Sequence, residues 1–139
     1  MIWVLDASVA AKWFFADEAR RAQAVAVRAA LVAGPELFVV PHLFFSETAH
    51  LLGRRSGRDR AFCAKGMGLL LRLGLRTLGL SEGGWRRVAH GVASGLTGYD
   101  ATYVALAREL GGRWITDDTK AAELIGERWA CRLADWAGS

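Results

Sequence analysis

The sequence predicts an α/β domain built on a mainly parallel central sheet. Short apolar runs that favour β-structure alternate with helical stretches along the chain, and this alternation is typical of parallel sheets. No repeat and no low-complexity linker interrupts the alternation. The chain has 139 residues, 53% of them hydrophobic, which is enough for one domain with a substantial core. We therefore expect a single domain over residues 1–139.

The predicted strands and helices follow one another in a regular order. Residues 2–5 (IWVL) carry no charge, which is typical of a strand buried on both faces. Residues 7–34 have a helical pattern with a break near Ala16 and Asp17, and Asp17 can cap the second piece. Beyond them we expect strand 37–40, helices 41–55 and 60–74, strand 76–80, helices 81–93 and 99–111, strand 113–116, helix 118–126 and strand 128–133.

Composition narrows the class of protein. The two cysteines, Cys63 and Cys131, are few and far apart, which fits a reducing compartment and predicts neither a disulfide framework nor a cysteine metal site. The strand-like sequence directly after Met1 lacks the pattern of a secretory signal, and no apolar run is long enough to cross a membrane. These features predict a soluble protein of the cytoplasm.

The net charge is +4, and arginine carries most of the positive charge. Four arginines, Arg54, Arg55, Arg58 and Arg60, crowd into the segment RRSGRDR, which has the composition of a loop or helix end. Arginine forms bidentate contacts with phosphate and carboxylate groups. The segment is therefore either a contact for a polyanion or an acidic partner, or a solvated surface turn.

Acidic residues directly follow two of the predicted strands. Asp6 comes after strand 2–5, and Asp117 and Asp118 come after strand 113–116. Parallel strands end at one edge of their sheet, and sites form there, so these carboxylates suit one shared crevice. Asp6 and Asp118 can instead cap the helices that follow them.

Two further acidic residues lie on apolar helix faces. Glu47 points in a direction close to that of Phe44, and Asp100 shares a face with Tyr103. A carboxylate on a buried face must be paired, protonated or bound to a cation, because an isolated charge is costly to bury. Arg54, two turns after Glu47, is a candidate structural partner, and Asp100 can interact with the dipole of its own helix.

Four of these carboxylates come from separate elements and together indicate a cation site, namely Asp6, Glu47, Asp100 and Asp118. Ionised acids that pack together repel each other unless a cation joins them. The histidines, His42, His50 and His90, lack the spacing of a zinc site, and oxygen ligands favour Mg²⁺ or Mn²⁺. A hydrated Mg²⁺ can activate water and neutralise a phosphate, so the residues predict metal-assisted phosphodiester hydrolysis.

Four fragments occur in a characteristic order along the chain: LDASVAAKWF, SETAHLL, YDATYVALAREL and ITDDTK. With this order and spacing the sequence resembles PIN-domain proteins, and in particular the VapC-type toxins of bacterial toxin–antitoxin pairs. The resemblance covers essentially the whole chain. It implies a three-layer α/β/α fold, a homodimer, Mg²⁺- or Mn²⁺-dependent endoribonuclease activity on RNA, and inhibition by a cognate antitoxin.

The resemblance also assigns roles to single residues. It places four carboxylates in an acidic catalytic pocket, namely Asp6, Glu47, Asp100 and Asp118, and of these Asp6, Asp100 and Asp118 are the metal ligands. Ser8 and Thr116 fall where the family has small hydroxyl residues that support the pocket, while Asp117 occupies a variable place. The arginine-rich segment then becomes a candidate contact for the RNA backbone or the antitoxin.

Other families with an aspartate after the first strand fit less well. A haloacid-dehalogenase phosphatase needs a second aspartate where this chain has Ser8, and the acidic pair and late lysine of a response-regulator receiver are not evident. A catalytically silent PIN-like module that docks a protein partner stays open as the alternative. Trp13, Phe14 and Phe15 can serve such docking or contact an antitoxin, but core and dimer packing is the simpler interpretation.

Overall fold

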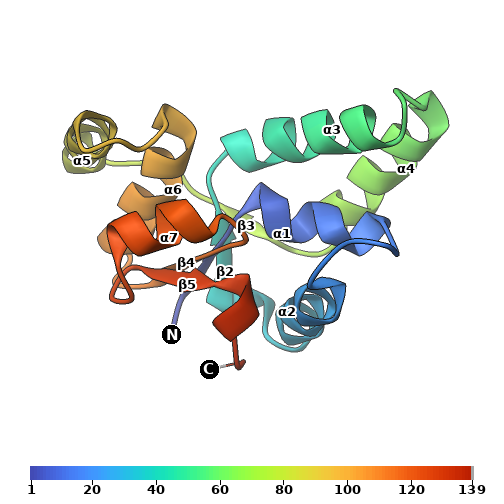
Figure 1. The fold of residues 1–139 in the computed structure, drawn as a ribbon, viewed down its shortest axis with the longest axis horizontal. Helices are drawn as coiled ribbons and strands as arrows, with labels where there is room; N and C mark the ends of the chain where they lie inside the picture. Colours follow the sequence, from blue (N-terminus) through green and yellow to red (C-terminus); the bar gives the residue numbers. More distant parts are fainter. Residues whose placement is uncertain (139) are drawn as a thin grey trace.

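The computed structural model describes residues 1–138, and a five-stranded sheet lies at its centre (Figure 1). The strand order is β3-β2-β1-β4-β5, and every neighbouring pair is parallel. The strands are β1 (Trp3–Leu5), β2 (Phe38–Val40), β3 (Arg76–Thr77), β4 (Arg113–Thr116) and β5 (Ala130–Arg132). The parallel sheet that the sequence predicts is therefore confirmed.

Seven α-helices alternate with these strands in residues 1–138. They are α1 (Ala7–Ala11), α2 (Arg21–Ala33), α3 (Leu43–Arg55), α4 (Arg60–Leu71), α5 (Glu82–Ala93), α6 (Gly98–Glu109) and α7 (Thr119–Ile125). Three short 3₁₀ turns complete the described elements: η1 (Lys12–Phe14), η2 (Pro35–Leu37) and η3 (Leu133–Asp135). Helices cover both faces of the sheet, which confirms the three-layer α/β/α architecture.

Local capping explains where several helices begin. Asp59 accepts a hydrogen bond from the Phe62 amide, and Ser81 accepts one from the Gly84 amide, at the starts of α4 and α5. Thr97 does the same for α6, whose first amides would otherwise lack partners. These caps lie close to the helix starts that the sequence predicts.

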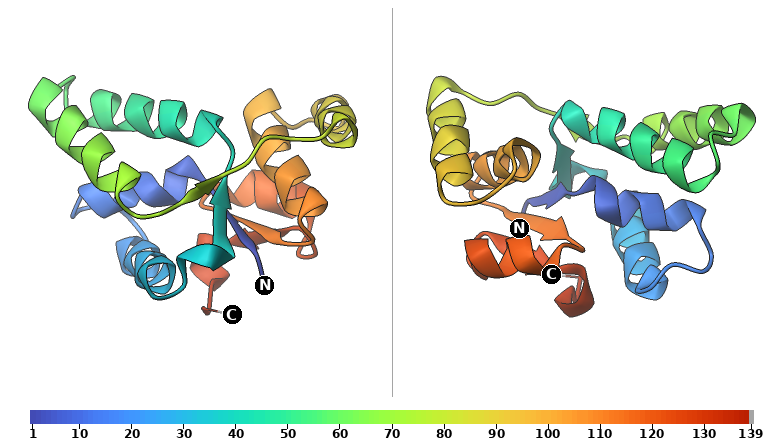
Figure 2. Two further views of the ribbon diagram at one scale, coloured as in Figure 1. Left: turned by 180° about the vertical axis from the view of Figure 1, so that it is seen from behind. Right: turned by 45° about the horizontal axis from the view of Figure 1, so that its top comes forward.

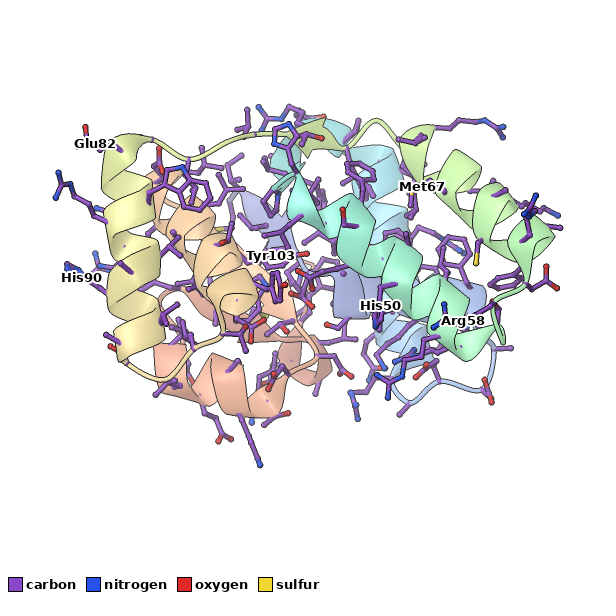
Figure 3. The ribbon with its side chains drawn as sticks, turned by 90° about the horizontal axis from the view of Figure 1, so that it is seen from above. His50, Arg58, Met67, Glu82, His90 and Tyr103 are labelled. Carbon is purple, nitrogen blue, oxygen red and sulfur yellow. The ribbon has the colours of Figure 1, made fainter. Side chains whose placement is uncertain are left out.

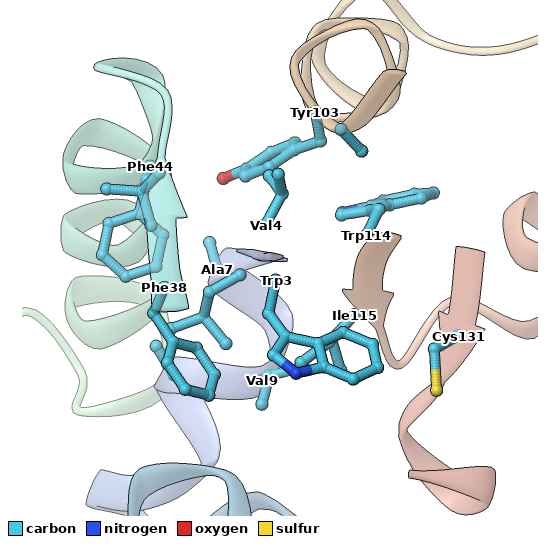
Figure 4. Packing of buried hydrophobic residues seen from close by; sticks show 14 of the residues in the cluster. Trp3, Val4, Ala7, Val9, Phe38, Phe44, Tyr103, Trp114, Ile115 and Cys131 are labelled. Carbon is cyan, nitrogen blue, oxygen red and sulfur yellow. The ribbon is translucent and has the colours of Figure 1, made fainter. Parts of the chain in front are cut away.

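The core fills the space between the sheet and the helices on either side (Figure 4). Val4 and Trp114 lie opposite each other in register, and Tyr103 of α6 stacks on Trp114 with ring centroids 6.0 Å apart. On the other face, Leu5 and Ile115 are in register and fully buried. β1 is thus buried on both sides, as its uncharged sequence predicts.

The helices α3 and α4 form a hairpin that packs on α1 (Figure 2). The connection between them spans residues 56–59, so the arginine-rich segment lies at a helix end and in a loop, as predicted. On the other side of the molecule, α5 packs on α6 (Figure 2). Gly91 allows this close approach, because a β-carbon there would lie 3.1 Å from the Ala101 side chain.

The sequence prediction for the first helical stretch is wrong in its details. Helix α1 ends at Ala11 and α2 begins only at Arg21, and its N-cap residue is Arg20 rather than Asp17. Arg20 has a left-handed backbone with φ 57°, and its side chain binds Asp117, which is 97 residues further along the chain. Tertiary ion pairs therefore decide how residues 15–20 run, and local helix propensity does not.

Several smaller features follow from the same structure. Strand β3 is shorter than the predicted strand 76–80, and Cys63 and Cys131 are free thiols, the second of them buried. Trp13 is buried in the core, where its indole Nε1 donates to the Ala24 carbonyl at 2.7 Å. Among residues 1–138, no helix combines the length and the apolar character that a bilayer crossing requires.

Candidate active site

The carboxyl ends of β1 and β4 lie side by side at the centre of the sheet, where the order of strand addition reverses. β2 and β3 lie on one side of β1, and β4 and β5 on the other, so this end of β1 and β4 is the switch point of the sheet. The Asp6 amide donates to the Ile115 carbonyl at 3.0 Å, which continues the pairing beyond Leu5. Asp6 and residues 116–118 therefore leave the sheet side by side.

Asp6 lies at the base of this crevice and is buried. It is the N-cap of α1: its Oδ2 accepts from the Ser8 amide at 2.8 Å, and its Oδ1 accepts from Trp114 Nε1 at 3.1 Å. Burial raises the pKa of the Asp6 carboxyl, the donors of Ser8 and Trp114 oppose this rise, and the charge of Asp118 adds to it. Asp6 is thus a helix cap whose carboxyl group is also repelled by the charge of Asp118.

Asp118 is the N-cap of α7 and is exposed to solvent. Its Oδ1 accepts from the Ala121 amide at 3.0 Å, and its own amide donates to Thr116 Oγ1 at 3.1 Å. Thr116 is fully buried, so this hydrogen bond ties the Asp118 backbone to the end of β4. The hydroxyl of Thr116 thereby holds the turn that carries the carboxylate.

Asp117 has a different environment from its neighbour. Its carboxylate binds Arg20 Nε at 2.5 Å and Lys12 Nζ at 3.1 Å, and its amide donates to Ser8 Oγ at 3.2 Å. Burial raises the pKa of Asp117, but the hydrogen bonds from Arg20 and Lys12 outweigh it and hold the pKa below its usual value. Asp117 is therefore engaged in structural ion pairs, while Asp118 has no basic partner in the described chain.

Glu47 and Asp100 approach the crevice from α3 and α6, and both are half-buried. Burial, together with the charges of Asp6 and Asp100, raises the pKa of Glu47 to about 7, although the neighbouring Tyr103 hydroxyl opposes the rise. Burial and the charges of Asp6 and Asp118 raise the pKa of Asp100 to about 6, although the Thr97 hydroxyl opposes the rise. The carboxylates of four separate elements thus lie close enough to disfavour each other's ionisation.

Two polar atoms beside these carboxylates are buried without a hydrogen-bond partner in residues 1–138, namely Glu47 Oε1 and Tyr103 Oη. Figure 3 shows Tyr103 between α6 and α3, so its hydroxyl lies at the side of the crevice. The predicted alternative for Glu47, an ion pair with Arg54, is not formed among the described residues. Buried polar atoms without partners are costly, so this cluster has unmet capacity to bind a polar ligand.

The oxygen atoms of these carboxylates are the type of ligand that a hard divalent cation prefers. The nearby side chains offer carboxylate oxygens without a histidine or cysteine cluster, and their mutual repulsion is what a bound cation would relieve. Their present orientation is less favourable, because no three acidic, histidine or cysteine side chains in residues 1–138 converge at ligand spacing. Asp6 and Asp118 instead direct an oxygen each to a backbone amide.

The arginines of the segment 54–60 divide into two groups. Arg55 pairs with Glu18 and lies over the Phe15 ring at 5.8 Å, so it is engaged within the protein. Arg54 and Arg58 are exposed and line a surface pocket of about 640 Å³. Arg60 is exposed at the first turn of α4. The sequence pattern treats the four as one cluster, and the structure separates them.

The aromatic residues after α1 are mostly structural. Trp13 is buried, and Phe15 packs on Phe62 of α4 with ring centroids 5.4 Å apart. Phe14 is half-buried, and its ring packs close to Gly66 of α4, where a β-carbon would lie only 3.4 Å from the ring. Core packing, the simpler interpretation of the three residues, is confirmed for Trp13.

Three residues of this region escaped the sequence prediction. Lys12 and Arg20 hold Asp117, and Trp114 donates to Asp6. A lysine inside the apolar run AAKWFF is the only sequence signal that could have pointed to the first of them, because a buried lysine needs an acidic partner. Arg20 and Trp114 carry no local signal, since their partners are distant in sequence.

The family comparison places this fold among known proteins. The family model described as PIN domain matches residues 3–126. No curated protein matches the chain in sequence.

Two solved structures share the fold. VapC20 of Mycobacterium tuberculosis, described as a sarcin-ricin loop cleaving toxin, superposes with a TM-score of 0.66 at 20% identity, over 86% of this chain and 93% of that one. PAE2754 of Pyrobaculum aerophilum superposes with a TM-score of 0.71 at 19% identity, over 96% of this chain and 92% of that one. At such identities the likeness concerns the fold.

Proposed function

The chain belongs to the PIN domain family, and from this premise we propose that it is a metal-dependent endoribonuclease of the VapC toxin type. The observation that carries the proposal is the meeting of four carboxylates, from four separate elements, at the switch point of the sheet. The fold that it shares with VapC20, a toxin described as cleaving the sarcin-ricin loop, supports the same assignment. The proposed reaction is hydrolysis of an RNA phosphodiester bond.

Asp6, Asp100 and Asp118 would hold a Mg²⁺ or Mn²⁺ ion. When bound, such an ion neutralises the clustered acids and the substrate phosphate and lowers the pKa of water. Glu47 would accept a hydrogen bond from the attacking water at Oε1, an atom that has no other partner in the described residues. Ser8 and Thr116 would support the pocket by fixing the backbone at residues 117 and 118.

In this proposal Asp117 positions the turn that carries Asp118. Its ion pairs with Lys12 and Arg20 tie the turn after β4 to α1 and to the start of α2. The adjacent Asp118 is then free of basic partners and can face the other carboxylates. We therefore assign the metal-binding role to Asp118 and a structural role to Asp117.

A nuclease that acts on cellular RNA needs control, and we propose a cognate antitoxin as its partner. An arginine of that protein would neutralise the acidic crevice and compete with metal or substrate phosphate. Half-buried Phe14 and Phe15 can contribute to the apolar contact, whereas the buried Trp13 cannot. The proposal also includes a homodimer and a cytoplasmic location, where the RNA substrate is found.

The direct test is cleavage of RNA by the purified protein. We expect fragments with Mg²⁺ or Mn²⁺ and none with EDTA, and we expect the Asp118→Asn protein to fail under both conditions. Absence of cleavage with either metal across a varied set of RNAs would reject the nuclease assignment. A silent PIN-fold module that docks a protein partner would then be the better description.

A test in cells addresses the toxin assignment separately. Expression of the protein alone should arrest growth, and co-expression with the neighbouring reading frame should restore it. A protein that cleaves RNA in vitro but has no effect on growth would support the nuclease assignment and reject the toxin assignment.

A further inference from the structure

A surface pocket adjoins the candidate active site along α3. It has a volume of about 390 Å³ and is lined by Leu43, Ser46, Glu47, His50, Leu51 and Tyr99. Small-molecule sites usually measure about 300–1,000 Å³, so this space can take a group of the size of a nucleobase. Because Glu47 is both a lining residue and one of the four carboxylates, the pocket opens directly beside the reacting group.

Tyr99 gives this pocket an aromatic wall. Its side chain is 64% exposed, although it directly precedes the half-buried Asp100. An exposed aromatic ring next to a phosphodiesterase centre offers a stacking face for a base, and stacking tolerates any base because every base has a π-face. Leu43 and Leu51 complete the apolar lining.

A second pocket continues from the first along the same helix. It has a volume of about 640 Å³, and its lining includes His50, Arg54 and Arg58. His50 lines both pockets, so the two adjoin at this residue, and together we name them the α3 groove. From Glu47 to Arg54 the helix rises by about 10 Å. In Figure 3, His50 and Arg58 follow one another along the α3 hairpin, away from Tyr103.

The backbone holds Arg58 in an uncommon conformation at the end of the groove. Arg58 has φ 63°, in the left-handed region that side chains other than glycine rarely adopt, and its amide donates to the Gly53 carbonyl at 2.7 Å. Such a conformation is unfavourable for a residue with a side chain and persists only where surrounding contacts impose it. The turn thereby keeps Arg58 on the wall of the groove beside Arg54.

From these features we infer that the α3 groove is the track for single-stranded RNA: the base next to the cleaved bond stacks on Tyr99, and Arg54 and Arg58 bind backbone phosphates. The inference rests on the proposed nuclease function. Arg55 is outside the track, because it is paired with Glu18. Single-stranded RNA is the occupant that fits both halves of the groove, an aromatic pocket joined to a basic one.

A second basic groove provides the matched control. It lies between α5, α6 and α7, has a volume of about 500 Å³ and includes Arg86, Arg87, His90 and Arg108 in its lining. We name it the α5 groove. None of its lining residues is one of the four carboxylates, so it carries similar charge without a connection to the active site.

The test measures binding of a short fluorescein-labelled single-stranded RNA of mixed sequence by anisotropy, in the non-cleaving Asp100→Asn background. The double variant Arg54→Ala/Arg58→Ala should reduce the slope of log Kd against log salt by about 1.4, from about 0.7 for each lost phosphate contact. Arg86→Ala/Arg87→Ala should leave the slope unchanged. Equal slopes for both pairs, or a loss confined to the α5 groove, would overturn the track.

The stacking part has its own variants. Tyr99→Ala should weaken binding by about 5- to 150-fold with an unchanged salt slope, because stacking is not a charge contact. Tyr99→Phe should bind like the parent protein, since the ring remains. If the phenylalanine variant is as weak as the alanine variant, or neither is weaker, the base pocket is wrong.

Cleavage by the otherwise unmodified chain separates the two proposals. RNA that binds in the α3 groove but is never cut with Mg²⁺ or Mn²⁺ would reject the nuclease function and leave the track in place. If cleavage is unaffected by both the Arg54→Ala/Arg58→Ala and the Tyr99→Ala changes, the RNA track is rejected and the nuclease function stands. A protein that neither binds nor cuts RNA would reject both.

Discussion

The two basic grooves of this protein carry similar side chains in different positions. The α5 groove has Arg86, Arg87 and Arg108, and the α3 groove has Arg54 and Arg58. Only the α3 groove is continuous with a lining carboxylate, Glu47. Arginine content alone would therefore favour the α5 groove, whereas connection to the acidic crevice favours the α3 groove. A basic surface can serve a reaction only where the chain that it binds reaches the reacting groups.

The largest effect that tests this comparison is expected at Asp100. Asp100→Asn removes a proposed metal ligand from the acidic end of the α3 groove, so metal-dependent RNA cleavage should fall by more than about 10- to 100-fold, the loss typical of outer-shell partners of metal sites. The fold should persist or gain stability, because burial and the charges of Asp6 and Asp118 disfavour the ionised side chain. Single-turnover cleavage and thermal melting measure the two effects. Full activity with Mg²⁺ would remove Asp100 from the site.

The neighbouring pair Asp117 and Asp118 separates structure from chemistry. Asp118→Asn should abolish cleavage with little change in stability. Asp117→Asn should lower the free energy of unfolding by about 1–3 kcal/mol, because it removes one of the two carboxylates that pair with the buried Lys12 and leaves only Glu18, and it should reduce cleavage less. Denaturant unfolding and cleavage rates compare them directly. The reverse order of effects would exchange the roles of the two residues.

The acidic end should also respond to pH and metal together. The pKa of Glu47 is raised to about 7 and that of Asp100 to about 6, so both carboxyls favour the neutral form in the folded protein. The metal-free protein should therefore gain stability as pH falls from about 7 to about 5, where these groups take up protons. Mg²⁺ should raise the melting temperature more at the upper pH, where it replaces those protons. A Mg²⁺ effect independent of pH would separate the ion from these carboxylates.

The smallest effect distinguishes two adjacent arginines. Arg54→Ala should reduce the salt slope of RNA binding by about 0.7, the value for one phosphate contact on a single strand. Arg55→Ala should leave the slope unchanged, because its side chain is paired with Glu18, and should alter stability by no more than about 1 kcal/mol. Identical slopes for both variants would place the RNA contact elsewhere.

Much of the fold was predictable from local pattern. The uncharged run of residues 2–5 and the caps at Ser81 and Thr97 are signals that act over a few residues, and the structure has a strand and two helices there. The break after α1 was predictable, but its geometry was not. Asp17 has the chemistry of a cap, yet the ion pair of Arg20 with Asp117 decides where α2 begins.

The candidate site divides in the same way. The sequence by itself determined which residue types occur after β1 and β4 and on the inner faces of α3 and α6, because strand ends and helical periodicity are local properties. Local pattern could not separate Asp117 from Asp118, or Arg55 from Arg54, since neighbours in sequence share every local signal, and only the family resemblance favoured Asp118. The tertiary structure supplies the physical difference, by placing Lys12, Arg20 and Glu18 beside one member of each pair. Charge partners distant in the chain meet through packing, and for that reason their pairing belongs to the fold rather than to any segment of the sequence.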